Sequence, residues 1–231
     1  MQLWAVHEIV VHLTITTIGS DMKTIVCFGD SNTWGYTPET GLRYSYNQRW
    51  PGVLQGQLAN RAQVVEEGLN GRTTSFDEPF RSGRDGSVVL PSILESNRPL
   101  DLLIIALGAN DLQPLYNASG YDSARGLEKL IGIAKRSEAG PEHSAPEILC
   151  IAPTRFNQSC EVVKRLLVNT DTKFAVLLEE YQRVTSVAMC HYFDSNDVIV
   201  VSELDGVHID ASNHNKLGMA VAEKAQSILR F

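Results

Sequence analysis

Clustered positive charge is missing from this sequence. Lysine and arginine number 20 against 27 aspartates and glutamates, the formal net charge is −7, and basic residues form no long run. Nucleic acid binding depends on clustered cations, so we expect no nucleic acid partner. Cysteine is also scarce. The four cysteines form no CxxC pair and no zinc-finger spacing, and we expect Cys27 and Cys150 to be small buried residues of strands.

Long unbroken hydrophobic runs are missing as well. The opening stretch MQLWAVHEIVVHLTITTIGSD is apolar, but His7, Glu8 and His12 interrupt it, and it lacks the basic leader and cleavage pattern of a secretory signal. We therefore expect a cytoplasmic protein with no membrane partner, with secretion as the alternative. Residues 1–21 are expected to be an N-terminal appendage of uncertain structure, or an extra strand, preceding a single domain over residues 22–231.

Apolar runs and helical patterns alternate along the rest of the chain, which is 43% hydrophobic. Short apolar runs predict buried strands, and apolar residues at helical spacing predict helices between them. Strands are expected at 23–28, 62–68, 100–108, 147–153 and 197–201, and helices at 50–60, 88–97, 121–138, 172–190 and 212–229. This alternation predicts a three-layer α/β/α sandwich around a largely parallel five-stranded sheet.

Small and polar residues follow four of the expected strands. The four segments are GDS at 29–31, GLNG at 68–71, GAND at 108–111 and DGVH at 205–208. Ligands of open parallel sheets bind beyond the carboxyl ends of the strands. We therefore expect these segments to meet at one rim and to form a site there.

The residue types in these segments suit acyl transfer. A serine hydroxyl needs a base, and the base needs a carboxylate that orients it, so we expect Ser31 as nucleophile, His208 as base and Asp205 as its partner. The backbone N–H groups of Ser31 and Gly71 and the side-chain amide of Asn110 are candidate oxyanion donors. The G-x-S-x-G elbow of α/β-hydrolases is absent around Ser31, which disfavours that fold.

Each of these residues also has a purely structural interpretation. Ser31 suits a helix N-cap, Asn110 and Asp111 suit a cap of the following loop, and Asp205 suits a turn that leaves His208 on the surface. Four separate segments would each have to imitate a catalytic role, so we favour the functional interpretation. Asp30 and Asp111 are expected to be acceptors that hold the loops, not catalytic acids.

The blocks CFGDSNTWG, EEGLNGRTT, LGAND and DGVH, in this order, resemble the SGNH hydrolase superfamily, also called GDSL-type esterases. The resemblance covers residues 23–230 and is strongest to the bacterial arylesterase and acyltransferase branch. It implies a flavodoxin-like SGNH hydrolase fold, with Ser31, Asp205 and His208 as the triad and Gly71 and Asn110 in the oxyanion hole. Oligomers are frequent in that branch, so the resemblance allows a homo-oligomer.

Three residues near these blocks are candidates for the substrate pocket. Asn32 stands where the GDSL name has leucine, which affects packing or the pocket edge. Trp34 is expected to line the acyl or alcohol pocket, with plain packing as the alternative. Arg72 is expected to shape the site, or to be solvated. Tyr44 and Tyr46 suit either a stacked sugar or a subunit contact.

We expect a serine esterase that hydrolyses short-chain aryl or alkyl esters through an acyl-enzyme, without metal or cofactor, and that can also pass the acyl group to an alcohol. Alternatives on the same fold are a carbohydrate O-deacetylase and a lipid or thioester hydrolase. A degenerate binding module is the non-enzyme alternative. A metal-dependent hydrolase built on Asp205, His208, Asp210 and His214 is disfavoured, because their spacing matches no zinc pattern.

Overall fold

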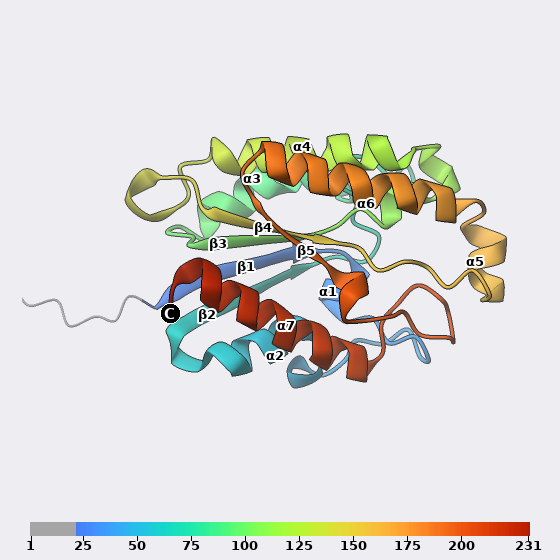
Figure 1. Ribbon diagram of the computed structural model, residues 1–231, viewed down its shortest axis with the longest axis horizontal. Helices are drawn as coiled ribbons and strands as arrows, with labels where there is room; N and C mark the ends of the chain where they lie inside the picture. Colours follow the sequence, from blue (N-terminus) through green and yellow to red (C-terminus); the bar gives the residue numbers. More distant parts are fainter. Residues whose placement is uncertain (1–21) are drawn as a thin grey trace, which may run out of the picture.

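The computed structural model describes residues 22–231, so the expectations for residues 1–21 lie outside the described residues. Within this range five parallel strands form one sheet in the order β2-β1-β3-β4-β5 (Figure 1). The strands are β1 (Lys23–Gly29), β2 (Ala62–Gly68), β3 (Leu102–Ala106), β4 (Glu147–Ala152) and β5 (His191–Asp194). The predicted parallel sheet is confirmed.

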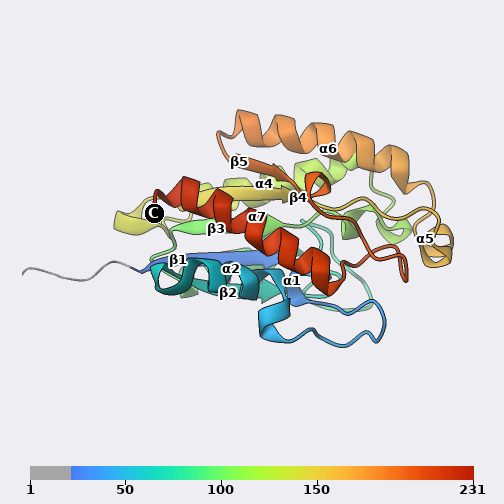
Figure 2. The ribbon, with the colours of Figure 1, turned by 60° about the horizontal axis from the view of Figure 1, so that its bottom comes forward.

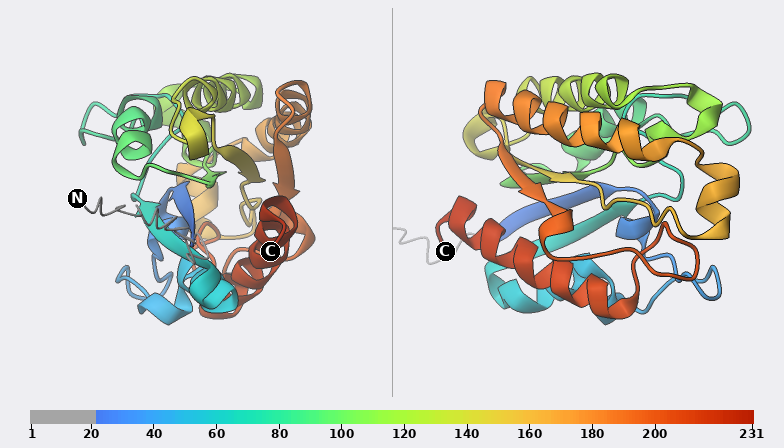
Figure 3. Two further views of the ribbon diagram at one scale, coloured as in Figure 1. Left: turned by 90° about the vertical axis from the view of Figure 1, so that its left-hand side faces the viewer. Right: turned by 45° about the vertical axis from the view of Figure 1, so that its right-hand side comes forward.

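Helices cover both faces of the sheet. Three of them, α3, α4 and α6, lie on one face, and α2 and α7 lie on the other, so that the end view in Figure 3 shows three layers. The helices are α1 (Ser31–Trp34), α2 (Trp50–Leu58), α3 (Gly86–Ser96), α4 (Gly120–Lys135), α5 (Glu161–Leu166), α6 (Thr170–Val187) and α7 (Ala211–Leu229). The sequence patterns did not predict the short helices α1 and α5.

Neighbouring strand residues point into two different cores. In β1, Val26 and Phe28 pack in the core beneath α3, α4 and α6, whereas Ile25 and Cys27 pack in the core beneath α2 and α7. All four side chains are buried, which explains the uninterrupted apolar run over these four positions. Cys27 and Cys150 are free and buried, as expected.

The two helices α2 and α7 lie side by side across one face of the sheet (Figure 2). Pro51 stands in the first turn of α2, where the N–H group that it lacks has no helical partner in any case. Asp210 caps α7, because its carboxylate accepts a hydrogen bond from the backbone N–H of Asn213. Both helices agree with their predicted positions.

The expected strand at 197–201 is wrong. The fifth strand is the preceding His191–Asp194, and residues 197–201 follow it outside any ladder. Ile199 and Val201 are buried and Val200 is 67% exposed, so the side chains alternate as in a strand. A strand requires a hydrogen-bonded neighbour, however, and the only neighbour of β5 is β4. The DGVH segment therefore reaches the rim after an extended segment, not directly after a strand.

No helix of residues 22–231 is long and apolar enough to cross a membrane.

Candidate active site

Ser31, His208 and Asp205 are joined by hydrogen bonds at the carboxyl end of the sheet. His208 Nε2 lies 2.9 Å from Ser31 Oγ, and His208 Nδ1 lies 2.6 Å from Asp205 Oδ2. Because a carboxylate accepts from Nδ1–H, the neutral imidazole presents an unprotonated Nε2 to the serine hydroxyl. The His208 and Asp205 side chains are 16% and 17% exposed, so a small molecule can reach this largely shielded pair.

Ser31 is held at the start of α1, immediately beyond β1. Asp30 is the N-cap of α1, and its carboxylate accepts a 2.9 Å hydrogen bond from the backbone N–H of Asn32. The structural alternative, in which Ser31 itself caps a helix, is therefore not what the structure shows. The Asn32 side chain contacts the loop that carries His208, because its Oδ1 accepts a 3.1 Å hydrogen bond from the backbone N–H of Ile209. Ser31 and His208 are thus fixed relative to each other through their next neighbours.

The loop that carries His208 is stabilised by hydrogen bonds between its own residues. Asp205 Oδ1 accepts hydrogen bonds of 2.9 Å from the backbone N–H groups of Val207 and His208. Ser202 N–H donates to the His208 carbonyl at 2.7 Å. Burial acts to raise the pKa of Asp205, but the hydrogen bonds from the His208 side chain and from the two N–H groups outweigh it and hold that pKa below its ordinary value. Asp205 is therefore ionised at neutral pH and can stabilise a positive imidazolium.

Three groups are candidate donors to the carbonyl oxygen of a substrate at Ser31: the backbone N–H groups of Ser31 and Gly71 and the side-chain amide of Asn110. Within residues 22–231, no protein atom accepts a hydrogen bond from the backbone N–H of Ser31 or of Gly71, so both remain available to a ligand. Gly71 has φ +80°, and a Cβ there would lie 2.4 Å from the Arg81 guanidinium. Asn110 Nδ2 donates to the Arg72 carbonyl at 3.0 Å, and an amide NH₂ retains a second N–H.

Asp111 fastens the two loops that carry these donors. Its carboxylate accepts hydrogen bonds from Thr74 N at 2.9 Å, Thr74 Oγ1 at 2.6 Å and Ser123 Oγ at 2.7 Å, and it is completely buried. Burial raises the pKa of Asp111 to about 7 and that of Asp30 to about 6. Both side chains bind backbone and hydroxyl groups of the loops, and neither hydrogen-bonds to Ser31 or His208.

Two small cavities of about 40 Å³ each lie beyond β1, at the segment that carries Ser31. One of them contacts Ser31 and Asn110 directly, and its other walls are Gln113, Phe156 and Leu167. The second is mostly apolar and is separated from the first by shared wall residues, namely Asp30, Asn32, Ala109 and Val207. Asn32 therefore lines both cavities.

Trp34 and Arg72 line neither of these cavities. The guanidinium of Arg43 lies 5.2 Å from the centre of the Trp34 ring. Arg72 is buried, lies over the Phe28 ring at 4.3 Å and donates to the Gly29 carbonyl at 3.0 Å. Burial lowers the pKa of Arg72 to about 10. Arg72 thus packs on and hydrogen-bonds to the end of β1, whereas the Trp34 ring contacts Arg43.

The four side chains of the metal-site alternative are separately engaged. His208 binds both Asp205 and Ser31, Asp210 caps α7, and His214 Nδ1 accepts from the backbone N–H of Trp50 at 3.3 Å. Among residues 22–231 no group of three or more His, Cys, Asp or Glu side chains is arranged to hold a metal ion.

The sequence and the fold match known proteins. A family profile described as the GDSL-like lipase/acylhydrolase family matches residues 27–213. The chain belongs to this family. A carbohydrate acetylesterase from Sinorhizobium meliloti is 33% identical, with a TM-score of 0.84 over 89% of this chain and 99% of that one. An aryl esterase from M. smegmatis is 35% identical, with a TM-score of 0.83 over 89% and 99% of the two chains. No curated protein matches the sequence.

Membership of the GDSL-like family makes the chain a serine esterase, that is, a carboxylic ester hydrolase on the SGNH fold. The sequence analysis missed several residues of the candidate site in this GDSL-family esterase. Tyr36 stacks on His208 with ring centroids 4.1 Å apart, and Gln113, Phe156 and Leu167 line the cavity beside Ser31. None of these four residues has a distinguishing pattern in the sequence, although Tyr36 lies just beyond the GDSNTWG block.

Proposed function

We propose that Ser31, His208 and Asp205 are the catalytic triad of this esterase and that its substrates are small carboxylic esters with short acyl groups. The observation that carries the proposal is the pair of contacts at His208, 2.9 Å to Ser31 Oγ and 2.6 Å to Asp205 Oδ2. Both contacts have the geometry that proton transfer from a serine to an oriented imidazole requires.

The reaction proceeds in two halves. Ser31 Oγ attacks the carbonyl carbon while His208 Nε2 takes the hydroxyl proton, and the carbonyl oxygen becomes an oxyanion facing Ser31 N–H, Gly71 N–H and the Asn110 amide. The C–O bond to the alcohol then breaks, and His208 returns the proton to the departing alkoxide. Water attacks the acyl-enzyme with His208 again as base, which releases the acid and restores Ser31.

The size of the cavity beside Ser31 supports short acyl groups. At about 40 Å³ it has room for only a few water molecules. Phe156 and Leu167 give it apolar walls, and Asn110 marks the end at which the oxyanion forms. An acetyl or propionyl group fits such a space, whereas a long acyl chain would have to displace side chains.

Hydrolysis of p-nitrophenyl esters tests the proposal. We expect the acetate and propionate to be turned over with the highest kcat/KM and the octanoate at least tenfold less efficiently. Ser31→Ala should abolish turnover of all of them. Equal or better turnover of the octanoate would contradict the short-chain proposal, and activity of Ser31→Ala would contradict the triad.

Carbohydrate O-deacetylation is the second candidate, since one similar structure is that of a carbohydrate acetylesterase. Acetylated xylose belongs in the same panel, with acetate release as the readout. Tyr46 is 42% exposed and available for a stacked sugar, whereas Tyr44 lies edge-on to His214 at 5.2 Å. Alcohols added to the assay test acyl transfer through the yield of new ester.

A further inference from the structure

Tyr36 covers one face of the His208 ring. The two rings are stacked, with centroids 4.1 Å apart and an angle of 27° between their planes. We propose that Tyr36 is a positioning residue that stabilises the imidazolium of His208 through its ring face, and that the segment carrying it is clamped in place for this purpose. The inference rests on the proposed role of His208 as the base.

The segment that carries Tyr36 folds back on itself as a short hairpin. Tyr36 and Arg43 form an antiparallel bridge, and Thr37 N–H donates to the Leu42 carbonyl at 2.9 Å. Tyr44 N–H donates to the Gly35 carbonyl at 2.8 Å. The start of the hairpin is hydrogen-bonded to α1, the helix that begins with Ser31, because Tyr36 N–H donates to the Ser31 carbonyl at 3.0 Å. The Tyr36 ring is therefore placed relative to Ser31 as well as to His208.

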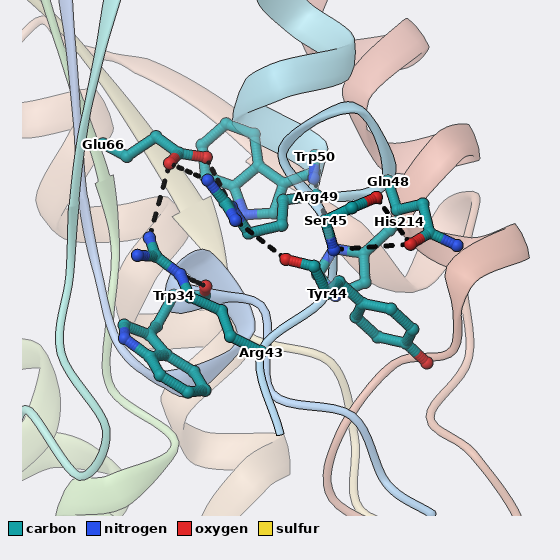
Figure 4. Close-up of polar contacts among 9 residues, drawn as sticks. All are labelled: Trp34, Arg43, Tyr44, Ser45, Gln48, Arg49, Trp50, Glu66 and His214. Carbon is teal, nitrogen blue, oxygen red and sulfur yellow. Dashed lines mark hydrogen bonds and ion pairs between the residues drawn. The ribbon is translucent and has the colours of Figure 1, made fainter. Parts of the chain in front are cut away.

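A partly buried ionic cluster of Arg43, Arg49 and Glu66 connects the base of this hairpin to the sheet (Figure 4). Arg49 binds Glu66 of β2 through two contacts, Nε to Oε1 at 2.9 Å and Nη2 to Oε2 at 2.6 Å. Arg43 approaches the same Oε2 at 3.4 Å. Glu66 thus receives both arginines of the hairpin region, and Arg49 is only 8% exposed. Removal of the Glu66 carboxylate would leave the charge of Arg49 buried and unpaired, which is strongly destabilising.

Both arginines also grip the hairpin backbone. Arg43 Nε donates to the Trp34 carbonyl at 2.7 Å, and Arg49 Nη1 donates to the Tyr44 carbonyl at 2.8 Å (Figure 4). Gly35 has φ +91°, and a Cβ there would lie 2.3 Å from Cδ of Arg49. The stem of Arg49 therefore packs directly on the residue that precedes Tyr36.

The other groups around His208 leave the faces of its imidazole ring as the place where Tyr36 makes contact. Three titratable groups that interact electrostatically with His208 are Asp205 of its own loop, Asp30 beyond β1 and His214 of α7. Asp205 holds one edge of the imidazole, and Ser31 faces the other. The faces of the ring remain, and Tyr36 covers one of them. A cation over a tyrosine face is stabilised by the negative potential of the ring.

The test compares Tyr36→Phe, which keeps the ring face, with Tyr36→Leu, which keeps apolar cover but removes the face. The readout is the pH profile of kcat/KM for p-nitrophenyl acetate. Loss of the face weakens proton binding by His208, so Tyr36→Leu should move the midpoint of the acid limb to lower pH by about half a unit and lower kcat about threefold or more. Tyr36→Phe should keep both values, as should Tyr121→Leu, a distant control at a half-exposed tyrosine.

A purely structural role for Tyr36 lowers the plateau of the profile without moving its midpoint, and this result would overturn the proposal. An equal loss in Tyr36→Phe would overturn it too, since the hydroxyl would then be responsible. The rate at which a fluorophosphonate labels Ser31, followed against pH, gives the same midpoint without turnover and serves if Tyr36→Leu is poorly active. An inactive wild-type protein contradicts the proposed function itself, before any variant is compared.

Discussion

The side chain of Asn32 is hydrogen-bonded to the backbone of Ile209, with 3.1 Å between Asn32 Oδ1 and Ile209 N. Asn32 follows Ser31, and Ile209 follows His208, so one bond links the neighbours of the two groups that exchange a proton in the proposed reaction. The same hydrogen bond connects the segment after β1 to the loop that precedes α7. Positioning at this level affects rate, because misplacement of reacting groups by about 1 Å can cost about 100-fold.

Asn32→Leu, which introduces the leucine of the GDSL name, should therefore lower kcat about tenfold and the free energy of unfolding by about 1 kcal/mol. Steady-state kinetics and urea denaturation measure the two effects. Asn97→Leu is the matched control, since it removes an amide hydrogen bond, to the Ile93 carbonyl, at the far end of α3. A fully active Asn32→Leu enzyme would show that the bond does not position the pair.

Asp111 anchors the oxyanion loops through three hydrogen bonds with Thr74 and Ser123. Asp111→Ala leaves a buried N–H and two hydroxyls without their carboxylate acceptor. We expect it to lower the free energy of unfolding by about 3 kcal/mol. Asp111→Asn keeps an acceptor for Thr74 N–H and should recover most of that loss. Asp122→Ala, at the exposed cap of α4, should cost about 1 kcal/mol. Equal losses in Asp111→Ala and Asp122→Ala would contradict this account.

His214 gives the stability a defined pH dependence. Burial lowers its pKa from the ordinary 6.5 to about 3, so below pH 6.5 the unfolded chain binds a proton there that the folded chain does not. Stability from this residue is therefore complete above pH 6.5 and is lost progressively as the pH falls toward 3. Between about pH 7.5 and pH 5 the loss amounts to about 2 kcal/mol.

The measurement is urea denaturation of wild type and His214→Gln at both pH values. The raised pKa values of Asp30 and Asp111 act in the opposite direction, because their protonation favours the folded state, so only the difference between the two proteins isolates His214. We expect His214→Gln to be less stable than wild type at pH 7.5 and to lose about 2 kcal/mol less on acidification. Parallel curves would contradict the assignment.

The central strands were predictable because they are buried on both faces. β1 contains the apolar run at residues 25–28 and β3 is apolar throughout, as expected of strands that helices cover on both faces. β5, with the sequence HYFD, is a short edge strand whose outer residues meet water, and the adjacent DVIVV has the stronger β propensity. Propensity describes a side chain, whereas a strand is defined by its partner, and the partner cannot be found within a few residues of sequence.

The candidate site likewise contains residues that the sequence could predict and residues that it could not. Ser31, Asp205 and His208 were predictable because their types specify one chemistry and because strand ends converge. Tyr36 was not, because its contact with His208 depends on a hairpin held by Arg49 and Glu66, and a tyrosine after a loop motif has no distinguishing pattern. Trp34 and Arg72 line neither of the two cavities described above, since nearness to a motif in sequence does not say which way a side chain points.

Labelling with a fluorophosphonate, followed by mass spectrometry of the intact protein and its peptides, tests most directly whether His208 activates the hydroxyl of Ser31. We expect one label per wild-type chain, on the peptide that contains Ser31, at least 100-fold slower labelling of His208→Ala, and none on Ser31→Ala. Ser195→Ala, at another buried serine, should be labelled like wild type. A label on any other residue, or one that Ser31→Ala still acquires, would contradict the account.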